Sequence, residues 1–389
     1  RLGTVDGIRF EGQQRTNPEV LRSMVQARPG ALLTEPEIAT DLRRLYGRGD
    51  FEHVDYRIVP EGDRRELVFG VQEKATGPGF LRFGLGFATD FRGGSQFNLR
   101  GSYRRTWLNS LGAELLLDAQ VGRRNVLLGE LYQPLAVDGR WFAAPYFSFE
   151  STRREFFVGD RSVAELRGND SRAGIDLGTV GEVRLGVLGR RVRSRTMIGL
   201  PLLPDDNESA RGLRARLLVD RLDRPYFSRD GHLVSLDAYA WQRNDETGRG
   251  AYRRLEGRFD YAVSVGRHTW NLSLQGGSRL GTDLPVFDAF SLGGPLMLSG
   301  YPLGRFLGEG MAFGRLQYFQ RTYTLPRTLG TGVYAGVSLE AAKMARMLGA
   351  VDDPGTLGSA AMFVGADTFL GPIHLVAGSC QDANRALQQ

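Results

Sequence analysis

The chain has 389 residues, of which 41% are hydrophobic, and its 50 Lys and Arg against 44 Asp and Glu give a net charge of +6. No apolar run approaches the roughly 18 residues that a membrane-spanning helix needs. The arginines are spread along alternating segments instead of forming one basic patch, so we exclude nucleic acid as a partner. The single cysteine, Cys380, excludes a disulfide within the chain.

The first part of the chain is predicted to contain a strand followed by two helices. The alternation in Val5–Phe10 predicts the strand. Asn17 followed by Pro18 predicts the start of the first helix, because Asn accepts hydrogen bonds from free N–H groups and Pro has no N–H to leave unpaired. Thr34 and Glu37 have the spacing of a capping box, which predicts the start of the second helix.

Residues 51–60 and 65–73 alternate as two further strands, so residues 1–75 are predicted to form a β-α-α-β-β domain. Four features of this segment stand out: an Ile8-x-Phe10-x-Gly12 strand, Leu45-Tyr46 at a helix end, Gly49-Asp50-Phe51, and Glu73-Lys74. Together they resemble a POTRA (polypeptide-transport-associated) domain, although a generic α+β module has the same order of elements. The resemblance implies a periplasmic domain that binds unfolded chains by adding a strand to its sheet edge.

From Phe80 onwards the pattern changes to long alternating segments separated by turns. Phe97-Leu99-Gly101-Tyr103 alternates with polar residues that include Arg100, and similar segments follow. Charges on one face of every strand would be costly in a dry core, but they are expected where that face lines a wet lumen and the other faces lipid. A soluble sandwich with one solvated face is the alternative. Segments of ten or more residues and aromatics near strand ends favour the barrel.

The fold class is therefore predicted to be mainly β, with a transmembrane antiparallel barrel of about 16 strands over residues 80–389. Fifteen strands are predicted, with 385–389 as the start of another. They cover residues 80–91, 94–108, 111–122, 124–134, 140–157, 161–179, 182–199, 210–220, 232–244, 250–265, 269–279, 311–323, 330–341, 358–368 and 371–379.

The eleventh connection, over about residues 280–311, is too long and too apolar for an ordinary turn. We expect its segment Asp283–Tyr301 to fold back into the lumen from the extracellular side. Another extracellular loop is expected at Ala341–Gly355, where Lys343–Leu348 has the composition of a short helix.

Three motifs in this region resemble the outer-membrane superfamily of barrel-assembly insertases, two-partner secretion transporters and patatin-type (type Vd) autotransporters. They are a periplasmic turn carrying Asp220, Asp223, Phe227 and Gly231, the lumenal loop Phe290–Tyr301, and Leu370-Gly371-Pro372 of the penultimate strand. The resemblance implies a lumenal loop in which the important residues are Leu292, Gly293, Gly294, Ser299, Gly300, Tyr301 and Arg305.

Two departures from the superfamily pattern stand out. The loop tip usually carries an Arg that reaches carboxylates on the barrel wall, and here that position is Ser299. Arg305 is a candidate substitute or a solvated loop residue, and Glu340 and Asp367 face the lumen by strand parity as candidate partners. The chain also ends without a full strand closing on an aromatic residue, so either a last strand is missing or the seam between first and last strands is poorly paired.

The resemblance implies a translocator that exports or displays a passenger, expected to be a patatin-like phospholipase encoded upstream of Arg1. An outer-membrane insertase or a two-partner secretion pore is the alternative, and a passive porin is a third. No Gly-x-Ser-x-Gly motif or metal-ligand spacing is present, so we expect no enzyme activity and no cofactor in this chain. The implied location is the outer membrane with the POTRA domain in the periplasm. The implied partners are outer-membrane lipids, the unfolded passenger, periplasmic chaperones and the barrel-assembly machinery.

Overall fold

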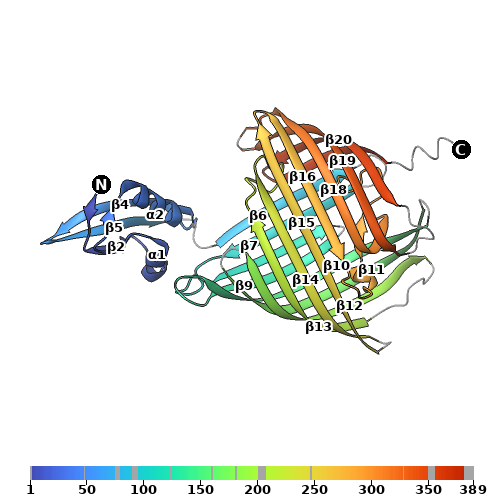
Figure 1. Cartoon of the computed structure of the whole chain (residues 1–389), viewed down its shortest axis with the longest axis horizontal. Helices are drawn as coiled ribbons and strands as arrows, with labels where there is room; N and C mark the ends of the chain where they lie inside the picture. The colour runs from blue at the N-terminus through green and yellow to red at the C-terminus, as the bar shows by residue number, and fades with distance from the viewer. Residues whose placement is uncertain are drawn as a thin grey trace.

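An N-terminal α+β domain lies at one end of a large β-barrel (Figure 1). No helix among the described residues has the length and apolar character to cross a membrane. The computed structural model describes residues 2–47, 49–74, 79–89, 95–122, 124–158, 161–179, 182–199, 207–245, 248–326, 328–348 and 355–380.

The N-terminal domain has a three-stranded sheet in the order β2-β5-β4, with β2 parallel to β5 and β4 antiparallel to it. Two helices pack on this sheet, and a small β1–β3 pair completes the domain. Its elements are β1 (Gly3–Thr4), β2 (Gly7–Glu11), α1 (Pro18–Met24), β3 (Leu32–Leu33), α2 (Glu35–Gly47), β4 (Phe51–Glu61) and β5 (Arg64–Glu73).

The helix starts are those that the sequence predicts. Asn17 caps α1, because its side chain accepts a hydrogen bond of 2.9 Å from the backbone N–H of Glu19. At α2, the Thr34 N–H donates to the Glu37 carboxylate at 3.1 Å and the Glu37 N–H donates back to the Thr34 hydroxyl at 3.4 Å, which is a capping box. The predicted caps are confirmed.

Within the described residues, the second domain is a closed ring of fifteen strands, and one further short strand, β17, is bonded to β18 without being a member of the ring. The predicted fold class is confirmed. Residues 385–389, where a further strand was expected, lie outside the described part of the chain. The strands are β6 (Gly79–Thr89), β7 (Ser95–Arg105), β8 (Glu114–Gly122), β9 (Arg124–Pro134), β10 (Trp141–Val158), β11 (Arg161–Thr179), β12 (Val183–Gly199), β13 (Asn207–Asp220), β14 (Gly231–Asp245), β15 (Gly248–Val265), β16 (His268–Ser278), β17 (Phe290–Leu292), β18 (Phe306–Tyr323), β19 (Gly330–Met347), β20 (Thr356–Thr368) and β21 (Gly371–Cys380).

The alternation of side chains along each strand separates an apolar outer wall from a polar lumen. On β12, Leu185 and Val187 point outward and are 60% and 54% exposed, whereas Arg190 on the other face is 5% exposed. The lumenal face holds buried charges because the strands and the loop inside the ring supply their partners. This alternation is what a barrel in lipid requires.

Two sequence expectations need comment. Lys343–Leu348 does not form a helix, because β19 continues to Met347. Ala342 and Met344 are buried while Lys343 is exposed, so the segment has the two-residue period of a strand. The sequence also places the acidic pairs Asp205–Asp206 and Asp352–Asp353 in loops between strands, where they are expected to be solvated, and both pairs lie outside the described residues.

Candidate functional site

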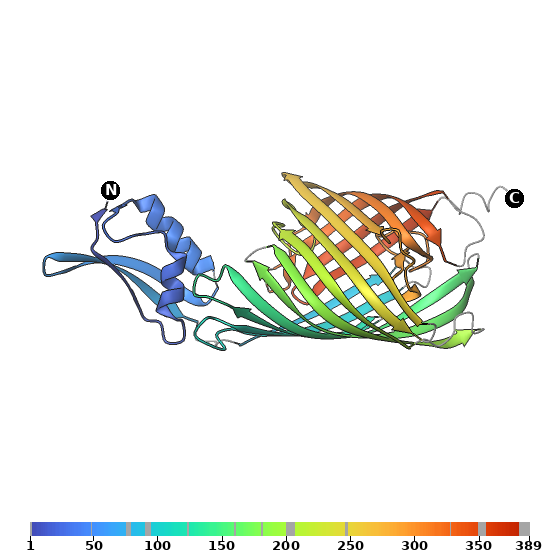
Figure 2. The same ribbon diagram turned by 60° about the horizontal axis from the view of Figure 1, so that its bottom comes forward.

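The long connection between β16 and β18 lies inside the ring of strands, where Figure 2 shows it as the orange segment. It contains the 3-10 helix η1 (Val286–Asp288) and β17, which pairs with the start of β18. Leu292 and Leu298 are 0% exposed and Tyr301 is 5% exposed. The predicted loop residues from Leu292 to Tyr301 therefore lie against the lumenal wall, and we call residues 279–305 the lumenal loop.

Glycines allow the lumenal loop to fold this tightly. Gly300 has φ of +95°, and a Cβ there would lie 2.9 Å from the backbone of Ser379 and Cys380 on β21. Gly293 has φ of +120°, and its Cβ would lie 2.3 Å from the carbonyl oxygen of Pro302. Both positions combine a left-handed backbone with contact to another backbone segment, so only glycine fits without distortion. Gly294 also has a left-handed backbone, with φ of +112°, but its Cβ would meet a side chain, at 2.6 Å from Leu303 Cδ1.

Ser299 itself contacts Glu340, one of the two candidate wall partners. Its N–H donates to Glu340 Oε2 at 2.6 Å and its hydroxyl donates to Oε1 at 3.1 Å. Ser338 and Ser359 donate to the same carboxylate at 2.7 and 2.9 Å. A neutral residue therefore bonds to the wall carboxylate without an ion pair. Asp367 is placed elsewhere and accepts a hydrogen bond of 2.6 Å from Thr331.

Arg305 does not replace the arginine that the superfamily carries at the loop tip. Its guanidinium lies 5.6 Å from the ring centroid of Phe157 and 5.4 Å from that of Phe306. The arginine nearest the tip comes from the wall instead. Arg315, which faces Glu340 across the β18–β19 ladder, donates to the carbonyl oxygen of Leu296 at 2.8 Å.

A second anchor, which the sequence analysis missed, holds the base of the lumenal loop. Asp288 of η1 accepts hydrogen bonds from Arg190 of β12 and from Tyr252 of β15, the latter at 2.6 Å. Arg190 also donates to the Tyr252 hydroxyl at 2.9 Å and pairs with Asp170 at 2.9 Å. Asp288, Arg190 and Tyr252 are 7%, 5% and 1% exposed. Here the loop supplies the anion and the wall supplies the cation.

Two more wall arginines bind the backbone around η1. Arg154 donates to the carbonyl oxygens of Val286 and Phe287 at 3.0 and 2.8 Å and to that of Ala289 at 3.1 Å. Arg254 donates to the carbonyl oxygen of Asp288 at 3.0 Å. The Val286 carbonyl oxygen also accepts from the Ala289 N–H at 3.3 Å, and the arginines give the carbonyls around this short helix side-chain donors.

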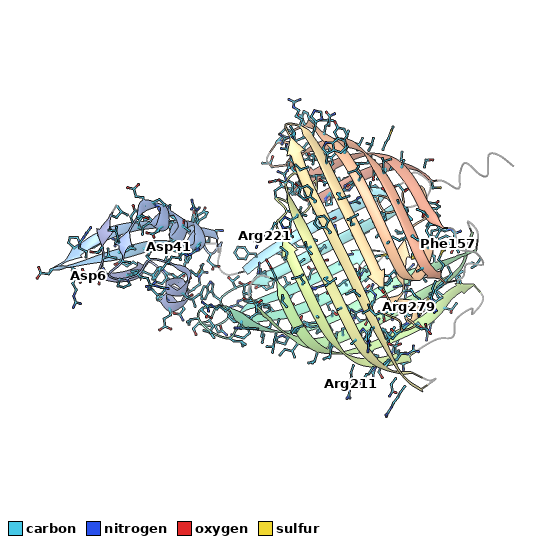
Figure 3. The ribbon with its side chains drawn as sticks, viewed as in Figure 1. Asp6, Asp41, Phe157, Arg211, Arg221 and Arg279 are labelled. Atoms are coloured by element: carbon cyan, nitrogen blue, oxygen red, sulfur yellow. The ribbon has the colours of Figure 1, made fainter. Side chains whose placement is uncertain are left out.

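The motif at Asp220–Gly231 forms a compact turn at the barrel end beside the N-terminal domain, where Figure 3 labels Arg221. Asp223 accepts hydrogen bonds from the N–H groups of Arg229 and Asp230 at 2.8 and 3.2 Å. Burial would raise the pKa of Asp223, but these bonds lower it below its usual value. Gly231 has φ of +106°, and a Cβ there would lie 2.0 Å from the Arg221 carbonyl oxygen. Asp220 accepts from Leu222 at 3.1 Å.

Phe227 of this turn enters the lumen from the periplasmic end. Its ring stacks on Tyr334 at 4.4 Å and on His374 at 4.8 Å between centroids. Leu296 of the lumenal loop packs against the same aromatic cluster. A cavity of about 210 Å³ lies beside this contact and is lined by both Phe227 and Leu296. Chain segments therefore enter the lumen from both ends, and the lumenal loop and the periplasmic turn are in contact.

The N-terminal domain contacts the periplasmic rim of the barrel. The Asn17 side chain donates to the Ser110 carbonyl oxygen at 3.0 Å, and the Ser23 hydroxyl donates to that of Val137 at 3.0 Å. Phe51 is 1% exposed in the domain core, and Gly49 has φ of +84° in the turn after α2. Among the described residues β4 pairs only with β5, so its other edge is open.

The seam of the ring lies between β6 and β21. Three register pairs join these strands, beginning with Ile373 opposite Phe87, and the pairing is parallel. The neighbouring strands β20 and β21 are joined by ten register pairs, from Ser359–Cys380 to Thr368–Gly371. The seam is therefore short in the described part of the chain, as expected if the first and last strands are poorly paired.

Comparison with known proteins agrees with this architecture. Residues 3–74 match the family model described as POTRA, surface antigen variable number repeat, which confirms the predicted resemblance. The whole structure is similar to BamA from Haemophilus ducreyi lacking POTRA domains 1–3, with a TM-score of 0.70 and 14% identity over 98% of this chain and 81% of that chain.

Two structures of CdiB are also similar. For CdiB from Escherichia coli the TM-score is 0.54 and the identity 16%, over 94% of this chain and 70% of that chain. For CdiB from Acinetobacter baumannii these values are 0.53 and 12%, over 94% and 68%. The chain is thus a POTRA–β-barrel protein, with the fold that these structures share. In this architecture the barrel spans the outer membrane and the POTRA domain lies in the periplasm.

Proposed function

We propose that this chain is an outer-membrane translocator that carries an unfolded polypeptide from the periplasm to the cell surface. The POTRA domain carries the proposal, because it rests on the periplasmic rim and has an open edge along β4. That edge starts at Phe51, which lies opposite Glu73 near the end of the domain. An extended segment added to it would be held close to the barrel.

The filled lumen supports a gated translocator over a passive porin. A porin keeps a water-filled channel, whereas here the lumenal loop is anchored through Asp288 and Ser299 and meets Phe227 from the opposite end. In planar bilayers we expect the protein to show little steady conductance. A large, stable open channel would contradict the gated reading and favour the porin.

We further propose that the passenger is a patatin-like phospholipase encoded upstream of Arg1. The test expresses the complete coding region and measures protease accessibility of the passenger on intact cells. Deleting residues 290–301 should reduce surface display while leaving cellular passenger levels unchanged. Equal display by the deletion variant would overturn the role of the lumenal loop, and a non-patatin sequence upstream would overturn only the passenger identity.

A second candidate, an insertase for outer-membrane proteins, is favoured by one observation. The seam between β6 and β21 has only three register pairs, so opening it breaks fewer backbone hydrogen bonds than opening any longer pairing would. An insertase would use the exposed edges of the opened seam as a template for a client strand. Depletion of the protein should then lower the amounts of several unrelated barrels, whereas a dedicated translocator would affect its own passenger alone.

A further inference from the structure

On β12 and β13, the outer wall changes from apolar to polar residues toward the extracellular end. On β12 the outward positions run through Leu185 and Val187, both more than half exposed, and then change to Arg191 and Arg193. The neighbouring strand β13 changes in the same way, from Leu213 to Arg211 and Ser209.

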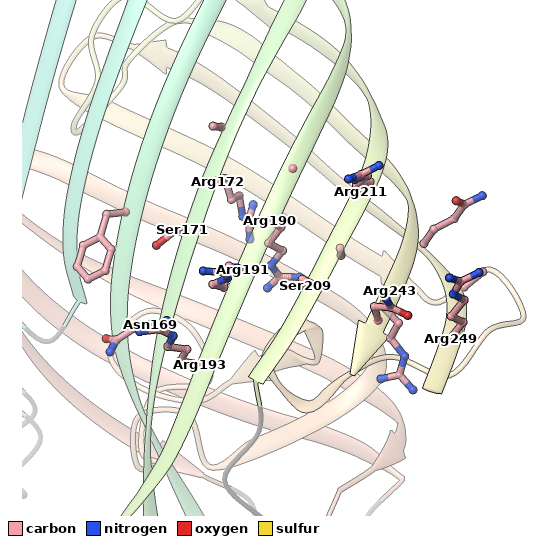
Figure 4. A pocket seen from close by; sticks show the side chains of 18 of the residues that line it. Asn169, Ser171, Arg172, Arg190, Arg191, Arg193, Ser209, Arg211, Arg243 and Arg249 are labelled. Atoms are coloured by element: carbon pink, nitrogen blue, oxygen red, sulfur yellow. The ribbon is translucent and has the colours of Figure 1, made fainter. Parts of the chain in front are cut away.

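The pairing register places these polar positions side by side. Arg191 lies opposite Ser171 on one side and Ser209 on the other, and Ser209 lies opposite Asn244, which in turn lies opposite Arg249. Figure 4 shows this region of adjacent strands, which surrounds a concave pocket with a volume of about 1360 Å³. We call Asn169, Ser171, Arg191, Arg193, Ser209, Arg211, Asn244 and Arg249 the outer arginine patch.

The outer arginine patch lies toward the extracellular end of the barrel. β12 starts at the periplasmic end, and Arg191 and Arg193 occupy its distal half. Figure 3 places Arg211 far from the POTRA domain, and Arg221 beside it. Phe147 and Phe149 of β10 line the same concave surface. The patch therefore joins the apolar wall directly, at the height where lipid head groups meet acyl chains.

The arginines of the patch are free to bind an anion. Arg190, one residue away on the lumenal face, is committed to Asp170 and Asp288. Within the described part of the chain, the side chains of Arg191, Arg193, Arg211 and Arg249 make no hydrogen bond or ion pair. Four positive charges with no carboxylate among them repel one another, so a second copy of the same patch would not cover them.

We propose that the outer arginine patch binds the phosphorylated head group of a lipid in the outer leaflet. A guanidinium presents a planar fork that bonds phosphate oxygens in pairs, and the nearby Ser and Asn side chains can add further hydrogen bonds. The acyl chains of such a lipid would lie along the apolar wall below, at Val187, Leu213 and Phe147. The site thus matches one amphipathic ligand in both its charged and its apolar parts.

The test uses the full chain purified in an uncharged detergent and measures lipid binding by native mass spectrometry. The probes are lipid A with two phosphates and the same lipid after removal of its phosphates. The wild type should retain the phosphorylated lipid through detergent exchange and lose the dephosphorylated one. Replacing Arg191, Arg193 and Arg211 together by Gln should weaken binding by about ten-fold or more.

The matched control is Arg105→Gln, an outward-facing arginine at the periplasmic end of β7, which should leave binding unchanged. Heat-modifiable migration on gels checks that each variant forms a barrel. Equal retention of the two lipids by the wild type would overturn the proposal even if the triple variant failed to fold. Equal binding of the phosphorylated lipid by a folded triple variant would also overturn it.

Discussion

Asp288 and Glu340 are both buried carboxylates at the lumenal loop, but they hold it by different means. Asp288 belongs to the loop and meets Arg190 and Tyr252 of the wall. Glu340 belongs to the wall and accepts from Ser299 of the loop together with two wall serines. A buried ion pair is costly to break from one side, because the remaining charge is left without its partner. The Asp288 anchor should therefore be the stronger constraint on the position of the loop.

Replacing Asp288 by Asn tests this ranking. The substitution keeps the size of the side chain but leaves Arg190 with Asp170 as its one remaining anionic partner among the described residues. We expect a loss of about 3 kcal/mol in stability, measured as the denaturant midpoint of the folded barrel on gels. Asp283→Asn is the control in the same loop. The Asp283 side chain is 82% exposed although it forms ion pairs, so its replacement should cost less than about 1 kcal/mol. Equal losses from both variants would contradict the ranking.

Glu73 gives the POTRA domain a defined acid sensitivity. Burial would raise its pKa, but hydrogen bonds from Thr16 and Arg15 lower the pKa from 4.5 to about 2. Because the folded pKa is the lower one, the stabilisation is complete above pH 4.5 and is lost as the pH falls toward 2. Glu73→Gln should cost about 1.5–3 kcal/mol at neutral pH and should flatten this dependence. Hydrogen exchange of residues 3–74 at several pH values measures the stability of the domain, and Glu52→Gln, at an exposed position, is the control.

At the scale of elements, the position of the lumenal loop depends on close contact with β21. Gly300→Ala would combine a strained φ of +95° with a Cβ only 2.9 Å from the β21 backbone. Gly281→Ala in the same loop has φ of +83° but no atom within 4 Å of the added Cβ. Both variants should lose about 1–2 kcal/mol to backbone strain, and the clash should displace the loop in Gly300→Ala alone. Limited proteolysis within the loop measures the displacement, and equal cleavage of the two variants would argue against the β21 contact.

The sequence predicts the strands better than it predicts the contacts inside the lumen. Two-residue periodicity gives β11 from Arg161 to Thr179 as the structure has it, because each strand has one lipid face and one polar face. The same period continues in Lys343–Met347, where local composition pointed to a helix and tertiary pairing decides the outcome. The Asp288–Arg190 anchor joins residues 98 positions apart, and no local pattern encodes such a pairing. A lone Asp in an apolar loop and an Arg at a lumenal position were the available signals.

For the whole molecule, the filled lumen and the short seam point to the same consequence. The lumenal loop and Phe227 obstruct a straight path through the barrel, while Ile373–Phe87 belongs to the shortest pairing in the ring, with three register pairs. A polypeptide that crosses or enters the membrane must displace the loop or open the seam. The two routes differ in one respect, because a covalent lock across the seam blocks only the second.

A disulfide across the seam distinguishes the two routes. Cysteines in place of Phe87 and Ile373, which are register partners, would join β6 to β21 once Cys380 is replaced by Ser to avoid mispairing. If the seam opens during function, the oxidised variant should lose most of its activity and recover it on reduction. Cysteines at Val364 and Leu375 join β20 to β21 at register partners and should have no effect on activity.

Full activity in the oxidised seam variant would exclude lateral opening and would leave displacement of the lumenal loop as the route. In that case Asp288→Asn should increase the conductance in planar bilayers, and Asp283→Asn should not.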